Sequence, residues 1–172
     1  MQHKVFQSNE KATFIADSML GDVARWLRLL GFDCIYNTSL NDDDLLQIAL
    51  KDQRILLTRD RVLHRRALLS GVKSLYFEAT DIVEVLKQIS KELQLHLNFD
   101  EKASRCPTCN SPLRRASKDE VSRKVPEGVL KRYDKFWVCS NAACGKVYWI
   151  GSHWKTIKKV LSSLNQKSKQ DK

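Results

Sequence analysis

The segment ILLTRDRVLHRRALLSG, residues 55–71, contains a strand and a helix in direct succession. Its first four residues are apolar or β-branched, which favours a strand buried on both faces of a sheet. Apolar residues then recur at helical spacing over residues 61–69, and Gly71 supplies a helix stop. The segment therefore predicts a buried strand that leads into an amphipathic helix.

The same alternation extends through the first hundred residues. Further strands are expected at residues 13–16, 32–36 and 74–77, and further helices at residues 20–30, 42–51 and 81–95. Strands that alternate with helices of about ten residues form βαβ units, which build a parallel sheet with helices on both faces. The first part of the chain is therefore predicted to have an α/β fold.

Composition and length limit the class of protein. The 172 residues, 42% hydrophobic and 29% charged, are enough for one α/β domain of about 100 residues and a small additional module. No apolar run approaches the roughly 20 residues of a membrane span, so we expect no membrane association. The first eleven residues are polar and lack the apolar core of a secretion signal. We expect a cytoplasmic protein.

Charge is distributed unevenly along the chain. Residues 1–100 contain 13 Lys and Arg against 14 Asp and Glu, whereas residues 101–172 contain 17 against 6. A basic region of this kind favours a polyanion as partner, because cationic side chains neutralise phosphates and release counterions. The alternative is a basic surface that serves only solubility. Nucleic acid is the favoured partner.

Two close cysteine pairs lie in the basic part of the chain. Cys106 and Cys109 are separated by two residues, and Cys139 and Cys144 by four. Four thiolates can complete the tetrahedral shell of a zinc ion, with no position open for chemistry, so this pattern predicts a structural zinc ribbon. The alternative, two disulfides, is disfavoured in a cytoplasmic protein. The fifth cysteine, Cys34, lies in an apolar strand and is expected to be a core residue.

Basic and aromatic residues alternate around the cysteines. The basic residues expected to contact RNA are Arg114, Arg115, Lys131 and Arg132, and the nearby aromatic residues are Tyr133, Phe136, Trp137, Tyr148, Trp149 and Trp154. Such a mixture suits phosphate contacts and base stacking. Alternatively, Phe136, Trp149 and Trp154 pack against a small ribbon core or against the first domain. His153 is a candidate for a substrate contact or for a structural hydrogen bond.

Acidic residues follow the predicted strands. Asp17 follows the first strand, Asp60 follows the third, and Asp42, Asp43 and Asp44 begin the helix after the second. Parallel strands bring their carboxyl ends to one edge of a sheet, where ligands bind. Carboxylates gathered there can bind Mg²⁺ or Mn²⁺, which activates water for attack on a phosphodiester. Each aspartate taken alone is better explained as a helix cap or first-turn acid, with Asp42 as an N-cap, and it is the coincidence of these acids at one edge that favours a catalytic site.

Several of these segments resemble a known family. They are FIADSMLG at residues 14–21, ARWLRLLGFD at 24–33, residues 42–46, LTRD at 57–60, RCPTCN at 105–110, Val125-Pro126 and VYWIGSHW at 147–154. In this order they resemble the PIN-like Mut-seven C-terminal RNase domain family, over about residues 13–161. The resemblance implies a PIN-like three-layer α/β/α sandwich with a zinc ribbon and a metal-dependent endoribonuclease activity.

The resemblance also implies roles for individual residues. Asp17, Asp42 and Asp60 take the positions that bind Mg²⁺ or Mn²⁺, with Asp43 as the alternative for the second. PIN nucleases often have a fourth acidic residue after the fourth strand, and only Glu78 or Asp81 stands there. The expected substrate contacts near this acidic edge are Arg25, Arg28, Thr58 and Arg59.

The predicted organisation is a PIN-like nuclease domain over residues 12–98, a zinc ribbon and C-terminal helix over residues 99–165, and a basic tail over residues 166–172. The function expected is cleavage of single-stranded RNA. The alternatives are an RNA- or ribosome-associated binding module without turnover, and a toxin-like nuclease controlled by a protein partner.

Overall fold

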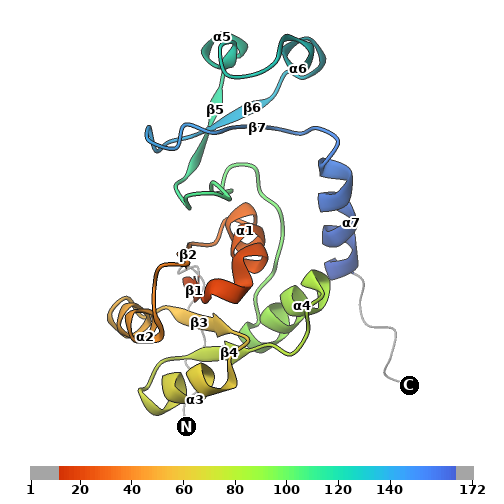
Figure 1. The fold of residues 1–172 in the computed structure, drawn as a ribbon. Coiled ribbons are helices and arrows are strands. Elements are labelled where there is room, and N and C mark those ends of the chain that lie inside the picture. Colours follow the sequence, from red (N-terminus) through yellow and green to blue (C-terminus); the bar gives the residue numbers. More distant parts are fainter. Residues whose placement is uncertain (1–11, 166–172) are drawn as a thin grey trace, which may run out of the picture.

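A computed structural model of the chain describes residues 12–165 (Figure 1). The polar N-terminal segment and the predicted basic tail, residues 166–172, lie outside the described residues. Four short strands form a parallel sheet in the order β2-β1-β3-β4. The strands are β1 (Phe14–Ala16), β2 (Cys34–Tyr36), β3 (Ile55–Thr58) and β4 (Ser74–Tyr76). The parallel sheet predicted from the alternating pattern is confirmed.

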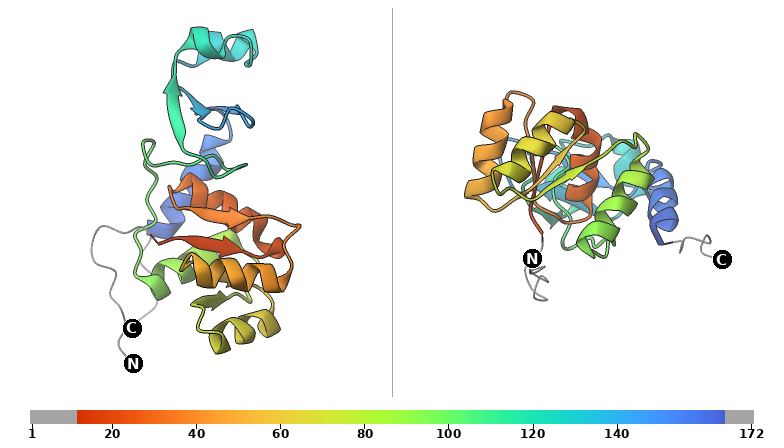
Figure 2. Two further views of the ribbon diagram at one scale, coloured as in Figure 1. Left: turned by 90° about the vertical axis from the view of Figure 1, so that its left-hand side faces the viewer. Right: turned by 90° about the horizontal axis from the view of Figure 1, so that it is seen from below.

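Helices cover both faces of this sheet, as Figure 2 shows. A short 3-10 helix η1 (Ser18–Leu20) precedes α1 (Gly21–Leu29), and the other helices are α2 (Asp42–Lys51), α3 (Arg61–Leu69) and α4 (Ile82–Leu93). The chain moves from β1 outward to β2 and then crosses back past β1 to β3. Because such crossovers are right-handed, this reversal places α1 and α2 on opposite faces. The predicted three-layer sandwich is therefore confirmed.

Alternating side chains divide the strand residues between two cores. Phe14 and Leu57 point into the larger core, which α1 and α4 cover. Ile15 and Leu56, their neighbours along the same strands, point into the smaller core under α2 and α3. The period of two residues along a strand produces this division, and burial on both faces explains the continuous apolar runs of the sequence.

The predicted element boundaries agree with the structure to within a few residues, and α2 and α3 begin and end where expected. One cap was wrong. Asn41, not Asp42, is the N-cap of α2: its side chain accepts a hydrogen bond from the Asp44 amide, and Asp44 accepts one from the Asn41 amide. This reciprocal capping box satisfies two amides at once and leaves Asp42 within the first turn.

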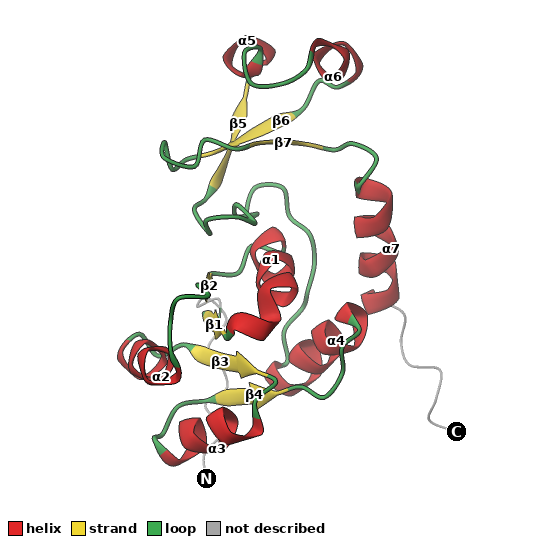
Figure 3. Cartoon of the chain, viewed as in Figure 1, coloured by secondary structure: helices red, strands yellow, loops and turns green. Residues whose placement is uncertain are grey.

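The ribbon is a second, antiparallel sheet in the order β5-β6-β7 (Figure 3). Its elements are β5 (Leu113–Ala116), α5 (Lys118–Val121), α6 (Glu127–Arg132), β6 (Phe136–Cys139) and β7 (Val147–Trp149). Its core is small, with Val121, Val125 and Phe136 as the buried residues. A core of this size provides limited hydrophobic stabilisation, so the ribbon depends on additional cross-links.

The last helix returns to the first sheet. Helix α7 (Trp154–Asn165) packs beside α4, where Val160 joins the larger core (Figure 1). The ribbon is therefore held at both ends, by the segment that leads into it and by the helix that follows. Among residues 12–165, no helix has the length and apolarity needed to cross a membrane.

Candidate metal centre and acidic edge

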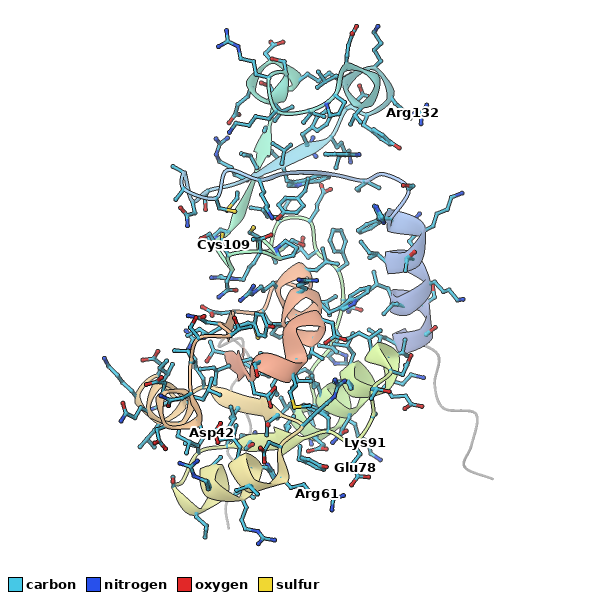
Figure 4. The ribbon with its side chains drawn as sticks, in the orientation of Figure 1. Asp42, Arg61, Glu78, Lys91, Cys109 and Arg132 are labelled. Atoms are coloured by element: carbon cyan, nitrogen blue, oxygen red, sulfur yellow. The ribbon has the colours of Figure 1, made fainter. Side chains whose placement is uncertain are left out.

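The four predicted zinc ligands come together at the end of the ribbon nearest α1. Figure 4 shows Cys109 in this position. A tight turn places Cys106 and Cys109, since the amide of Asn110 donates to the Cys106 carbonyl at 2.9 Å and Asn110 itself has a positive φ of 69°. All four thiol sulfurs lie within 4.8 Å of one another.

The cluster has the donor chemistry and spacing of a zinc site. Zinc–sulfur bonds of about 2.3 Å in a tetrahedron separate sulfurs by about 3.8 Å. The sulfurs of Cys106 and Cys144 are 3.8 Å apart, and those of Cys109 and Cys139 are 3.3 Å apart. These four cysteines can bind a metal such as zinc.

The pKa values of the thiols also favour a metal ion bound by the four cysteines. Burial raises the pKa of Cys109, but hydrogen bonds from Ser111 and neighbouring thiols outweigh it and lower this pKa to about 6. Burial and the hydrogen bond with Cys109 raise the pKa of Cys139 to about 12. Thiols this close ionise together only when a cation compensates their charge, which a bound dication does.

Cys34 lies outside the cluster, in the larger core, and has no exposed surface. Burial raises the pKa of its thiol to about 12, so it stays protonated. The expectation that Cys34 is a core residue is confirmed.

Asp17 lies at the carboxyl end of β1 and is 5% exposed. One carboxylate oxygen accepts a hydrogen bond from the Met19 amide at 2.8 Å. The other accepts from the Thr58 hydroxyl and from the Arg59 amide. Asp17 is therefore a cap of η1, as the alternative explanation held, and it is also linked to the end of β3.

Asp60 is joined to Asp17 through Thr58. The Asp60 amide donates to the Thr58 hydroxyl at 2.9 Å, and that hydroxyl donates to Asp17. One oxygen of Asp60, Oδ1, caps α3 by accepting from the amides of Val62 and Leu63. Within the described residues, the other oxygen, Oδ2, has no hydrogen-bond partner. This pair lies between β1 and β3, where the strand order reverses and where ligands of open α/β sheets bind.

Asp42 and Asp43 are held elsewhere by an arginine of α3. The Arg66 guanidinium lies 3.3 Å from Asp42 and also pairs with Asp43. Within residues 12–165, the four cysteines form the single group of three or more ligand side chains close enough to hold a metal. The structure therefore brings Asp17 and Asp60 together, and it does not bring Asp42 or Asp43 within metal-binding distance of that pair.

The two candidates for a fourth acidic position are also engaged. Glu78 pairs with Arg61 on the surface. Asp81 caps α4 by accepting from the amides of Val83 and Glu84. Neither completes a group of carboxylates with Asp17 and Asp60 among the described residues.

The three arginines expected near the acidic edge have different surroundings. Arg28 is 3% exposed, and its guanidinium donates to the carbonyls of Cys34, Pro107 and Thr108. It therefore joins α1 to the first cysteine turn and is not available to a substrate. Arg59 is half-buried and lies within 3.4 Å of the Met19 and Thr80 carbonyls. Arg25 is exposed, with no hydrogen bond or ion pair to any residue of 12–165.

A network that the sequence analysis did not single out also joins the two sheets. Asp33 accepts hydrogen bonds from Arg54 at 2.7 Å and from the Asn110 side chain at 2.9 Å, and Arg105 lies 3.5 Å away. Burial acts to raise the pKa of Asp33, but Arg54, Asn110 and Arg105 outweigh it, so this pKa lies below its usual value. The partners come from two segments distant from Asp33 in the sequence, so no local spacing indicated this contact.

The basic residues of the ribbon are only partly free. Arg114 pairs with Glu120, and Lys131 lies 2.6 Å from Glu127. Arg115 lies over the Trp137 ring at 5.2 Å and has no ion pair with a described residue. Arg132 likewise has none among residues 12–165, and Figure 4 shows it at the far end of the ribbon.

A cavity of about 540 Å³ lies where α1, the ribbon and α7 meet. Its aromatic walls include Trp26, Trp137, Tyr148, Trp149 and Trp154, and Arg25 and His153 are exposed at its rim. Phe136 is buried in the ribbon core and Trp149 packs against that core, as the packing alternative held. His153 makes no hydrogen bond through its ring to the described part of the chain.

The family model of the Mut7-C RNAse domain matches residues 12–161. The chain belongs to the Mut7-C RNAse domain family. The match includes both the parallel sheet and the ribbon, in agreement with the resemblance noted from the sequence. Membership indicates a nuclease-type function with RNA as substrate. No curated protein and no solved structure matches the chain.

Proposed function

We propose that this protein is a metal-dependent endoribonuclease that cleaves single-stranded RNA at the edge formed by Asp17 and Asp60. The observation that carries the proposal is the position of Asp17 and Asp60 at the point where the strand order reverses: the Thr58 hydroxyl donates to the Asp17 carboxylate and accepts from the Asp60 backbone amide. Two acidic side chains from separate strands lie at the position where α/β sheets bind ligands. The RNase family supports RNA as the ligand.

Asp17 and Asp60 are suited to hold Mg²⁺ or Mn²⁺. Magnesium is usually bound by one or two protein carboxylates, with water and substrate phosphate as further ligands, so two aspartates are enough. The Asp60 oxygen that does not cap α3 is available for this purpose. The metal supplies charge stabilisation and a lowered pKa for bound water.

The surrounding residues position this pair. Thr58 and the Arg59 amide fix one oxygen of Asp17, and the Met19 amide fixes the other. Fixed carboxylates lose little freedom on binding a cation, which favours binding. We assign Arg25 to phosphate contacts, because its guanidinium is exposed and without a described partner. Asp42 and Asp43 remain candidates for a third ligand, and taking that role requires release from Arg66.

The ribbon has a structural and a binding role in this proposal. Zinc on the four cysteines stabilises a region with a small core of its own. Arg115 and Arg132, together with Arg114 and Lys131, contact RNA phosphates. We place the activity in the cytoplasm, where thiols stay reduced, in keeping with five free cysteines.

The test is cleavage of a labelled single-stranded RNA by the purified protein, with Mn²⁺ or Mg²⁺ and without either. Asp17→Asn and Asp60→Asn should each reduce cleavage by roughly 100-fold or more, since carboxylates in such roles contribute at least this much. Asp60→Asn should fold like the parent, because Asn is about as good an N-cap as Asp. Asp17→Asn keeps an oxygen for the Met19 amide but turns an NH2 group toward the Arg59 amide, so a loss of stability is expected and thermal unfolding is measured beside cleavage.

Asp100→Asn is the matched control. Asp100 is exposed and caps a turn by accepting from the Lys102 amide, far along the chain from the acidic edge. Its variant should cleave like the parent. Equal cleavage by all three variants would show that Asp17 and Asp60 act as caps alone.

One observation favours a second function, RNA binding without turnover. Arg66 holds Asp42 and Asp43 in ion pairs, and no third carboxylate of the described residues lies within metal-binding distance of Asp17 and Asp60. The same assay separates the two functions. Salt-sensitive RNA binding without any metal-dependent cleavage by the parent protein would favour the binding module.

A further inference from the structure

All four tryptophans of the chain line one cavity. Trp26 comes from α1, Trp137 and Trp149 from the ribbon sheet, and Trp154 from the start of α7. Trp26 is far from the other three in the sequence and meets them only in the folded chain. The space of about 540 Å³ between these aromatic walls opens to solvent and is not filled by the described residues. Its volume lies within the range of ligand pockets.

Two of the rings are held in place by their neighbours. The Phe99 ring packs edge-on against Trp154, with ring centroids 4.5 Å apart. The Trp149 indole occupies the space beside Gly151, where an added Cβ would lie 2.9 Å from the indole nitrogen. Rings already fixed in one orientation bind a planar ligand without a further loss of freedom.

The lining of the cavity includes one arginine, Arg25, and one carboxylate, Glu101. Arg25 is exposed there and makes no hydrogen bond or ion pair with any residue of 12–165. At the Trp137 wall, the Arg115 guanidinium lies 5.2 Å from the ring centre, again without an ion pair to a described residue. Planar apolar walls with cationic groups beside them complement a planar base attached to a phosphate chain.

Helix α1 connects the acidic edge to the cavity. Helix α1 begins just after Asp17 and η1, and its later residues Arg25, Trp26 and Leu29 form one wall of the cavity. The helix has nine residues and is therefore about 13 Å long. A strand that lies along α1 reaches both places at once.

From these observations we infer that the tryptophan cavity binds an unpaired nucleobase of the RNA strand, with Arg25 on an adjoining phosphate. This inference rests on the proposed function, because it assumes that the bound strand is RNA. It adds to that function a binding subsite that selects single-stranded substrate. A paired base has both faces stacked and its edge occupied, so it cannot enter. Selection of single strands follows from this geometry.

The experiment measures binding to full-length, zinc-loaded protein without Mg²⁺ or Mn²⁺. Three probes are compared: a short single-stranded RNA, an abasic ribose-phosphate chain of the same length, and the same RNA in a duplex. Labelled-probe anisotropy gives affinity, and tryptophan fluorescence reports on the cavity. Stacking of one base contributes about 1–3 kcal/mol, so the abasic chain should bind about 5- to 150-fold more weakly and quench little.

Amino-acid substitutions test which residues of the cavity bind the base and the phosphate. Trp154→Leu should weaken RNA binding without changing affinity for the abasic chain. Leu29→Phe, which fills part of the cavity and removes no aromatic residue, should do the same if Trp154→Leu proves unstable. Arg25→Ala should weaken both single-stranded probes, whereas Arg65→Ala, an exposed arginine on α3 without a described partner, should change neither.

Equal affinity and equal quenching for RNA and the abasic chain would overturn the inference, as would unchanged RNA binding in Leu29→Phe. Its failure is distinguishable from failure of the proposed function. Base-dependent quenching without metal-dependent cleavage would overturn the nuclease and support the cavity. Cleavage with base-independent binding would support the nuclease and overturn the cavity.

Discussion

The cysteine cluster and the acidic edge are two groupings of ligand residues assembled in different ways. The cysteine cluster forms from two close pairs, each placed by a local turn, so only the meeting of the two pairs depends on the fold. The acidic edge draws on residues after three strands, and the structure joins Asp17 to Asp60 but leaves Asp42 with Arg66. Ligand residues that are close in sequence can be identified from their spacing. For ligand residues on separate strands, the topology predicts the edge of the sheet where they lie, but it does not predict the distances between their side chains.

The largest effect should come from the cysteine cluster. Metal analysis of protein purified without added metal should find about one zinc per chain. Binding of structural zinc to four cysteines is worth roughly 10–16 kcal/mol in zinc-finger peptides, far more than the small ribbon core can supply. Cys106→Ser or Cys139→Ser should therefore lose the zinc and unfold the ribbon.

Cys34→Ala is the control, because Cys34 lies in the larger core and outside the cluster. It should retain one zinc per chain and a folded ribbon. A parent protein without zinc, or a disulfide between Cys106 and Cys109 under reducing conditions, would contradict the zinc ribbon.

The next largest effect is expected where the ribbon is attached to α1. A comparison of two arginines of this helix tests that attachment. Arg28→Ala leaves carbonyls of Cys34, Pro107 and Thr108 without their donor, and should lower the free energy of unfolding by about 2–4 kcal/mol. Arg25→Ala should change it by less than about 0.5 kcal/mol, because Arg25 is exposed and has no described partner. Thermal or urea unfolding measures both.

Arg28→Lys sharpens the test. A lysine ammonium has no planar fork that reaches carbonyls on two sides, so it should restore only part of the stability. Equal stability of the parent and Arg28→Ala would mean that the ribbon is held by other contacts.

The fold could be predicted largely from patterns of short range. Apolar strands alternating with helices of about ten residues specified the parallel sheet, and the helix stop at Gly71 specified where α3 ends. Gly31 follows the end of α1 in the same way. Both glycines have positive φ, 87° and 77°, which only glycine adopts at little cost. At Gly31 an added Cβ would also lie 2.9 Å from the Ala103 carbonyl oxygen, a contact with the distant linker that no local pattern shows.

The sites were predicted less completely, for a physical reason. Arg25 and Arg28 looked alike in sequence and, three residues apart, are neighbours on the same side of one helix. Which of them becomes buried depends on where the cysteine turn packs, and no spacing within the helix shows this. Arg28 lies under the cysteine turn and Arg25 does not. The partners of Asp42 and Asp33 likewise come from other segments, so their ion pairs became visible only in the folded chain.

A moderate effect is expected for binding through the ribbon surface. Replacing Arg114, Arg115, Lys131 and Arg132 together with alanine should weaken RNA binding about tenfold and flatten its dependence on salt. Each phosphate contact contributes about 0.7 to the slope for single strands. Titration of labelled RNA at several salt concentrations measures this slope.

Two double variants separate the contributions of the unpaired and the paired basic residues of the ribbon. Arg115 and Arg132 lack ion pairs within the described residues, whereas Arg114 and Lys131 are paired with glutamates. Replacing the unpaired arginines should reduce the slope by about 1.4, and replacing the paired residues should reduce it by less. An unchanged slope in both double variants would place the RNA contacts elsewhere.

The smallest effect concerns the junction between the two sheets and its dependence on pH. The ribbon residues Asn110 and Arg105 meet Asp33, which also binds Arg54. Asp33 has a pKa below that of an unfolded aspartate, about 3.9. A carboxyl whose pKa is depressed by folding stabilises the protein above its unfolded pKa, and this contribution is lost as the pH falls through the folded pKa.

At neutral pH the parent should therefore unfold at a higher temperature than Asp33→Asn, and the difference should shrink only below about pH 4. Asp52→Asn is the control, because Asp52 is more exposed, lies 3.6 Å from the Arg54 guanidinium and does not meet the ribbon. Its difference from the parent should be smaller at every pH. Zinc content is measured in the same samples, since protonation of the thiols also releases metal. If NMR titration of the Asp33 carboxyl gives a pKa at or above about 3.9, hydrogen bonds from the ribbon do not stabilise its charge, and the junction depends on Arg28 instead.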